Sequence, residues 1–276
     1  MRLRAAMIAA AILISALILT MNGDGPETPE PTSETPHHST PTVLAQQLSE
    51  LPELPDTILR LTEDDFRQVA EKLGVEPASI KAVVEIEAGP AHKGFSAPGK
   101  PLINFDLTMF RRFATKRGVN LSKYSGSHSV VFNSHQGSQD KANRRLEAAK
   151  TIHNYAAVEG TFWGMFQIGG FNWDKCGCEN IDDFVMRMSR SERDQLDMFA
   201  EFIKNAGLLK YLRDKDWAAF ARGYNGPSYA RRNYHTRMAS AYAKYKGLKD
   251  TAYEELLINE EEEEPAEEPQ LAESEA

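Results

Sequence analysis

The chain has 276 residues, 41% hydrophobic and 26% charged, a composition typical of a globular protein with room for a sizeable core. Its formal net charge is -8, but eleven acidic residues and no basic one lie between Glu254 and Ala276, so residues 49–250 are basic. A basic body suits a polyanionic partner, either nucleic acid or the anionic bacterial envelope, and charge alone does not decide between them. No Gly-rich phosphate loop, zinc-finger spacing or RNA-binding aromatic motif appears in the sequence, and no nucleic-acid partner is expected.

The N-terminus has the pattern of an export signal. A short basic start, Met1–Arg4, precedes an uninterrupted apolar run from Ala5 to Met21. Bulky residues follow where a signal peptidase prefers small ones, so we predict an uncleaved signal anchor over residues 1–22, with an ordinary signal peptide as the alternative. We therefore expect the protein to be exported and to be tethered to the inner membrane, located in the periplasm, or both.

Two further segments are predicted to lie outside the folded body. Residues 23–48 are rich in Pro, Thr, Ser and Glu and form a linker, in which His37 and His38 are read as linker residues rather than metal ligands. Residues 251–276 form an acidic disordered tail. The body between them, residues 49–250, is expected to be one domain.

The body opens with two predicted helices. Thr62 is a good N-cap for a first helix that ends at Gly74. Pro77 starts a second helix, which Gly89 ends. Because Ile80, Val83 and Val84 share helical spacing with Glu87, this acid should lie on the stripe that faces the core.

Glu87 is the first candidate for chemistry. Ionising a carboxyl group on a core-facing stripe is costly, so its pKa should rise, which is what a general acid needs near neutral pH. The alternative is that Glu85 and Glu87 are ordinary surface acids, although negative charge near a helix C-terminus opposes the helix dipole.

A loop over residues 92–101 leads into a short extended piece, 102–106, that ends at Asp106 and runs into another helix. Residues 119–138 are polar and read as a surface loop or a small irregular lobe. Ser138 then begins a helix with apolar residues at helical spacing as far as Ala156.

The stretch 159–171 is rich in glycine and aromatic residues. Glycine lets the backbone approach a ligand and flat rings suit sugar faces, but a tight turn with packed aromatics is an equal alternative. Cys176 and Cys178, separated by one residue, supply too few ligands for zinc and are read as a strained local disulfide or as free thiols. No metal or cofactor is expected.

The remaining elements are also helical. An amphipathic helix covers residues 191–206, and a shorter one runs from about Asp216 to Arg222. Residues 223–227 should break it, before Tyr229 and Tyr234 lead into a last helix that ends near Gly247. No convincing alternating pattern occurs, so the fold class is mostly α with little or no sheet.

Residues 82–87, 162–172 and 217–227, taken together and in this order, resemble the phage N-acetylmuramidase endolysin family, and the similarity covers roughly residues 58–246. The resemblance implies a compact lysozyme-like helical domain that cleaves the MurNAc-β-1,4-GlcNAc bond of peptidoglycan. The layout is also similar to goose-type lysozymes and soluble lytic transglycosylases.

On that layout Glu87 is the catalytic acid and Glu85, which matches a second acid frequent in the family, is the reserve candidate. Asp106 stands where the family tends to carry Glu and is the candidate second carboxylate. The substrate-binding candidates in the saccharide groove are Trp163, Gln167, Tyr224, Asn225 and Tyr229.

The leading hypothesis is an exported muramidase of the endolysin type whose partner is the peptidoglycan glycan strand. The alternatives are a lytic transglycosylase that forms 1,6-anhydro-MurNAc and a non-catalytic peptidoglycan-binding protein that kept the fold. The product formed from peptidoglycan separates these classes.

Overall fold

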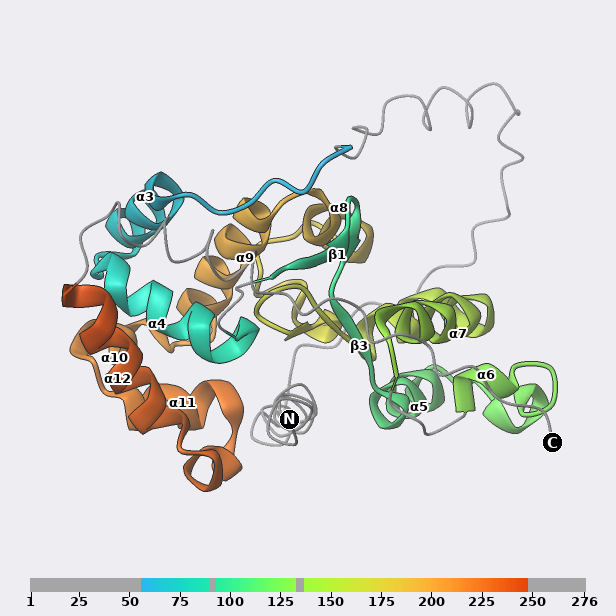
Figure 1. Cartoon of the computed structure of the whole chain (residues 1–276). Coiled ribbons are helices and arrows are strands. Elements are labelled where there is room, and N and C mark those ends of the chain that lie inside the picture. Colours follow the sequence, from blue (N-terminus) through green and yellow to red (C-terminus); the bar gives the residue numbers. More distant parts are fainter. Residues whose placement is uncertain (1–55, 90–92, 133–136, 248–276) are drawn as a thin grey trace, which may run out of the picture.

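The computed structural model describes residues 56–89, 93–132 and 137–247. It is mostly helical with two small antiparallel sheets, which confirms the predicted fold class (Figure 1). The predicted signal anchor, linker and acidic tail lie outside the described residues. Among the residues that are described, no helix is long and apolar enough to cross a membrane.

The elements follow one another along the chain with short connections. The helices are α3 (Glu63–Leu73), α4 (Pro77–Ala88), α5 (Leu107–Lys116), α6 (Ser129–Phe132), α7 (Gln139–Glu159), α8 (Ile181–Arg190), α9 (Glu192–Asn205), α10 (Leu209–Asp214), α11 (Trp217–Asn225) and α12 (Tyr234–Gly247). The 3-10 helices are η3 (Leu121–Tyr124), η4 (Gly170–Asn172) and η5 (Pro227–Arg232). The strands are β1 (Phe95–Ala97), β2 (Lys100–Pro101), β3 (Ile103–Phe105), β4 (Thr161–Trp163) and β5 (Ile168–Gly169).

The sheets consist of strands of two or three residues, too short for alternation to be visible in the sequence. β1 pairs with β2, and a second sheet has the order β3-β4-β5. In the second sheet Ile103 pairs with Trp163, and Trp163 pairs with Ile168. This sheet joins the segment before α5 to the glycine-rich stretch after α7.

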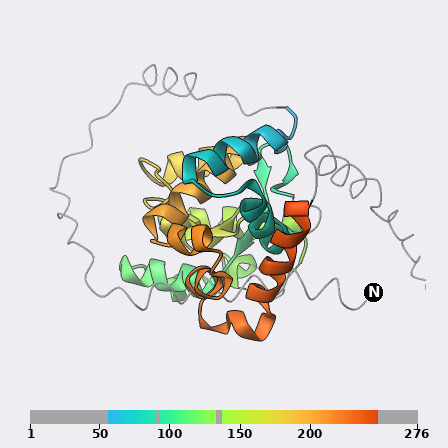
Figure 2. The same ribbon diagram turned by 90° about the vertical axis from the view of Figure 1, so that its left-hand side faces the viewer.

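Helix α4 is enclosed by its neighbours along its first two turns. Pro77 occupies the first turn, and Ile80, Val83 and Val84 are fully buried. Helices α3 and α12 pack on α4, as Figures 1 and 2 show. The sequence predicted that only one stripe of α4 faces the core. Instead, residues 78–84 are buried on all sides, and residues 85–88 are half-buried.

A buried ion pair connects α3 to α4. The Lys81 ammonium lies 2.7 Å from Oε2 of Glu63, and the two residues are only 6% and 4% exposed. Lys81 also lies over the Phe66 ring. Because a charge this deep needs a partner, the pair fixes how α4 sits against α3.

Polar side chains on α9 hold the loops around the sheets. Glu192 accepts hydrogen bonds from the backbone N–H groups of Leu61 (3.1 Å) and Gly94 (3.0 Å). Gln195 accepts from the N–H of Met165 at 2.7 Å and donates to the carbonyl of Met188 at 2.9 Å. These buried bonds fix the β4–β5 turn against α9.

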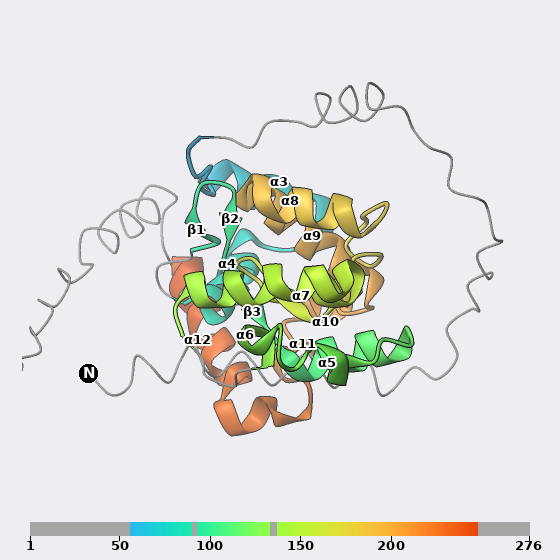
Figure 3. The same ribbon diagram turned by 90° about the vertical axis from the view of Figure 1, so that its right-hand side faces the viewer.

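The long helix α7 covers one face of the molecule, with α8 on one side and α5 and α6 on the other (Figure 3). Ser138 caps it, as predicted, by accepting from the N–H of Lys141. The region 119–138, predicted as a loop or irregular lobe, contains η3 and α6. Neither is long enough to give a periodic signal in the sequence.

The helix breaks within the predicted segment 223–227, but it ends three residues later than the predicted end at Arg222. Tyr224 and Asn225 belong to α11, which ends at Gly226 with φ 74°. Gly223 lies inside the helix, at a position where a Cβ would come within 2.4 Å of the Leu208 side chain. That glycine thus allows close packing between helices and does not end one.

Candidate active site

Glu87 lies in the last turn of α4 and is half-buried. Its Oε1 accepts a hydrogen bond from Nδ2 of Asn225 at 3.2 Å. Asn225 is the last residue of α11 and is 3% exposed. Two helix ends that are far apart in sequence therefore meet at one carboxyl group.

Burial raises the pKa of Glu87 to about 7. The hydrogen bond from Asn225 and the positive charge of Arg237 act in the opposite direction, because both favour the ionised carboxylate. Near neutral pH a substantial fraction of Glu87 is protonated. This is the property that the sequence predicted for the residue.

Tyr224 connects α11 to the turn between β4 and β5. Its hydroxyl donates to the carbonyl of Phe166 at 2.9 Å, and its ring stacks on Phe220. Burial raises the pKa of Tyr224 well above its usual value, and the nearby Glu87 adds to the effect. The phenol therefore stays neutral beside the acid.

Gln167 lies in that same turn, next to the Phe166 carbonyl. Its backbone has φ 47°, a left-handed conformation that is uncommon for a residue other than glycine. The side-chain amide donates to the carbonyl of Gly164 at 2.8 Å. A strained backbone held by its own side chain is typical of residues at functional sites.

Glu85 has different surroundings, although it is only two residues from Glu87. Its Oε2 accepts hydrogen bonds from the Tyr245 hydroxyl and from the Lys244 ammonium, the latter at 3.0 Å. Both partners belong to α12. Glu85 therefore joins α4 to α12, and its Oε2 atom already accepts two hydrogen bonds within the protein.

Asp106 is the N-cap of α5. Its Oδ1 accepts from the N–H of Met109 at 2.9 Å, and its negative charge acts on Arg145. Within the described residues no hydrogen bond or ion pair joins Asp106 to Glu87. Its role as a second carboxylate stays a prediction.

The two remaining aromatic candidates lie elsewhere. Trp163 is 3% exposed, donates its indole N–H to the Val158 carbonyl at 3.1 Å, and lines a cavity bordered by β2, α7 and α8. Glu87 does not line that cavity. Tyr229 lies half-buried in η5, with its ring edge-on to His235.

Comparison with known proteins agrees with this geometry. The family model described as Muramidase, N-acetylmuramidase, matches residues 76–246. The chain belongs to the N-acetylmuramidase family. The matched segment contains Glu87, the β4–β5 turn and Asn225.

A solved structure is also similar to this muramidase. It is the crystal structure of the Burkholderia AP3 phage endolysin, which has 33% sequence identity and a TM-score of 0.60. The match covers 73% of this chain and 75% of the endolysin chain. A comparison with curated protein sequences gives no match. The muramidase is thus a glycoside hydrolase of the N-acetylmuramidase type.

No sequence signal marked two residues of this muramidase that lie near Glu87. Tyr234 begins α12, and burial, helped by the charge of Glu87, raises its pKa to about 12. Arg237, one turn further along, is close enough to act on the Glu87 charge. Both follow the last recognisable motif, and only the packing of α12 on α4 brings them to Glu87.

The two cysteines of the muramidase are free thiols, which decides between the two predicted states. Both are buried, and burial raises their pKa values, that of Cys178 to about 11. They are therefore poor nucleophiles and poor metal ligands as they stand. Among the described residues no group of three or more His, Cys, Asp or Glu side chains is arranged to hold a metal ion.

Proposed function

We propose that this muramidase works as an endolysin, and that Glu87 protonates the glycosidic oxygen between MurNAc and GlcNAc. The observation that carries the proposal is the position of Glu87, half-buried at the end of α4 with a pKa raised to about 7 and one hydrogen bond, from Asn225. The similarity to a phage endolysin supports the biological role.

The chemistry follows from the surroundings of the carboxyl group. As the bond between C1 and the glycosidic oxygen breaks, the Glu87 proton moves to that oxygen and the carboxylate becomes negative. Asn225 then donates to a charged acceptor, and Arg237 stabilises the new charge. Water completes the reaction by adding its hydroxyl to C1 and returning a proton to Glu87.

We further propose roles for the residues around the acid. Asn225 orients the Glu87 carboxyl group, and the β4–β5 turn, with Gln167 held by Gly164, presents polar groups to the sugar. Tyr224 holds that turn against α11 through Phe166. Asp106 remains the candidate second carboxylate, and Trp163 and Tyr229 remain candidates for contacts with more distant sugars.

Product analysis tests the reaction class. Mass spectrometry of the muropeptides released by the muramidase should show fragments with a reducing MurNAc end, because water is the final acceptor. Products with 1,6-anhydro-MurNAc ends would instead identify a lytic transglycosylase. Binding to peptidoglycan without any release of fragments would identify a non-catalytic binding protein.

The pH dependence of the reaction tests the identity of the acid. Because Glu87 must be protonated to act, kcat is expected to fall as pH rises through about 7. Asn225→Ala removes a hydrogen bond that favours the charged form, so the same fall should move to higher pH. Rates of reducing-end release between pH 4 and pH 9 measure both; a fall that begins near the ordinary glutamate pKa would contradict the assignment.

We propose that residues 1–22 export the muramidase and tether it to the inner membrane, with the catalytic domain on the periplasmic side. The basic start and apolar run of the sequence support this. Fractionation of cells that express the full chain should place it with the membranes, and removal of residues 1–22 should leave it in the cytoplasm. A soluble full-length protein that starts at Met1 would overturn the proposal.

A further inference from the structure

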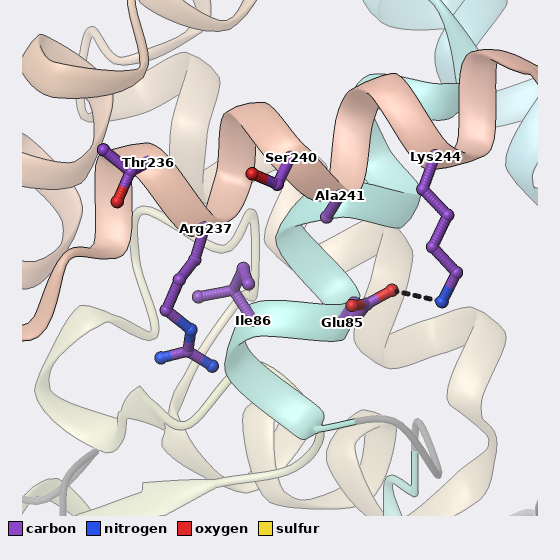
Figure 4. A pocket seen from close by; sticks show the side chains of 7 residues that line it. All are labelled: Glu85, Ile86, Thr236, Arg237, Ser240, Ala241 and Lys244. Atoms are coloured by element: carbon purple, nitrogen blue, oxygen red, sulfur yellow. Dashed lines mark hydrogen bonds and ion pairs between the residues drawn. The ribbon is translucent and has the colours of Figure 1, made fainter.

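A pocket lies between the last turn of α4 and helix α12. It encloses about 330 Å³ and is lined by Glu85 and Ile86 from α4 and by Thr236, Arg237, Ser240, Ala241 and Lys244 from α12. The α12 residues recur at the spacing of one helix face. Figure 4 shows that Arg237 and the Glu85–Lys244 pair lie on opposite sides of Ile86.

Of the two cationic side chains that line this pocket, Lys244 is paired with a carboxylate, and Arg237 has no such partner within the described part of the chain. At one end, the Lys244 ammonium lies 3.0 Å from Oε2 of Glu85, so that cation is neutralised. At the other end, the exposed Arg237 guanidinium lies over the Tyr234 ring. Among the described residues, no carboxylate lies within ion-pair distance of Arg237. The pocket therefore presents one guanidinium with its hydrogen-bond donors available to a ligand.

Hydroxyl groups lie beside this guanidinium. Ser240, one turn further along α12, lines the pocket with its hydroxyl. The Thr236 hydroxyl donates to the Asn233 carbonyl at 2.9 Å, so its proton is already engaged and it adds no donor for a ligand. A guanidinium with the Ser240 hydroxyl beside it is suited to a carboxylate, which the guanidinium can bind through two parallel hydrogen bonds.

The Arg237 end of the pocket is the end that lies near Glu87. Ile86 lines it, and Glu87 is the next residue of the same helix. The Arg237 charge acts on Glu87 itself. A ligand group bound by Arg237 is therefore expected to belong to a sugar beside the cleaved linkage.

We propose that this Arg237 pocket binds the carboxylate of the substituent on C3 of muramic acid, and so selects the sugar that precedes the cleaved bond. This rests on the proposed function. Of the two sugars in the glycan, GlcNAc is neutral, whereas muramic acid carries a lactyl group that ends in a carboxylate or continues into a peptide with carboxylates of its own. The shared ligand chemistry is a carboxylate on the C3 substituent of that sugar.

Three glycan substrates test the proposal. The first carries the stem peptides, the second has been stripped of peptide by an amidase and ends in the lactyl carboxylate, and the third is the stripped strand with that carboxylate converted to a neutral methylamide. For wild type at pH 5, where Glu87 is protonated, kcat/KM on each carboxylate-bearing strand should exceed that on the methylamide strand by roughly tenfold.

Arg237→Gln should bring that ratio close to one. Lys246→Gln is the matched control because it removes a positive charge from the same helix outside the pocket, and it should keep the wild-type ratio. Loss of selectivity on only the peptide-bearing strand, or only the lactyl strand, would support the proposal and identify which carboxylate binds. A wild-type ratio near one, or an Arg237→Gln variant that keeps the ratio, would overturn it.

Failure of the proposed function gives a different result. In that case the wild-type protein releases no reducing ends from any of the three strands. The selectivity ratio is defined only when hydrolysis occurs, so the two proposals fail separately.

Discussion

Glu87→Gln is expected to reduce the rate of peptidoglycan hydrolysis by roughly 10²- to 10⁴-fold, the range that general acid catalysis contributes. An amide cannot donate a proton to the glycosidic oxygen as a carboxylic acid does. The substitution preserves shape, and the glutamine Oε1 can still accept the hydrogen bond from Asn225. The loss should therefore appear in kcat, measured by reducing-end release below pH 7, with the fold intact by circular dichroism.

Glu85→Gln is the matched comparison, since it makes the same chemical change two residues away on the same helix. Its carboxylate pairs with Lys244 and Tyr245. Because this ion pair is partly exposed to solvent, its loss should lower the free energy of unfolding by at most about 1 kcal/mol. The rate of hydrolysis should stay close to that of wild type. If Glu85→Gln abolishes hydrolysis and Glu87→Gln does not, Glu85 is the catalytic acid.

The Glu87 variant also has an expected signature in stability. The folded-state pKa of about 7 lies above the value of 4.5 for an ordinary glutamate, so the folded protein holds this proton more tightly than the unfolded chain. Folding stability is therefore lost as pH rises from the lower value to the higher one. Glutamine does not ionise, so the variant should gain roughly 1–3 kcal/mol relative to wild type between pH 4 and pH 8 in urea unfolding.

Lys81→Met is expected to lower the free energy of unfolding by about 3–5 kcal/mol at pH 7. Methionine keeps the approximate length and the apolar stem of the lysine side chain but lacks the ammonium that pairs with Glu63. Glu63 is 4% exposed and would be left as an uncompensated buried charge. The effect should be visible as a lower urea midpoint.

The double variant Lys81→Met with Glu63→Leu should recover most of that loss, because no buried charge remains. Lys150→Met is the surface control: it breaks the exposed pair with Glu147 on α7 and should change stability by less than about 1 kcal/mol. If Lys81→Met is as mild as the control, the buried pair does not fix α4 against α3.

The position of Glu87 at the end of a buried helix could be read from local sequence, because its signals are local. Thr62, Pro77 and Gly89 act on the backbone within one turn, and the apolar residues of α4 recur at helical spacing. The same kind of signal gave the start of α7 at Ser138. Local sequence did not predict that α11 continues through Gly223. The glycine there allows close packing against Leu208, and a contact between distant segments leaves no local pattern.

Sequence by itself thus determined the helical class, most helix ends and an acid expected to hold its proton. Tertiary structure alone decided which of the two neighbouring glutamates is paired with α12 and which has a raised pKa. Residues two apart on a helix point about 200° away from each other, so Glu85 meets Lys244 and Tyr245 while Glu87 meets Asn225. The pKa of a carboxyl group depends on burial and on charges brought near it by distant segments, and those distances exist only after the chain has folded.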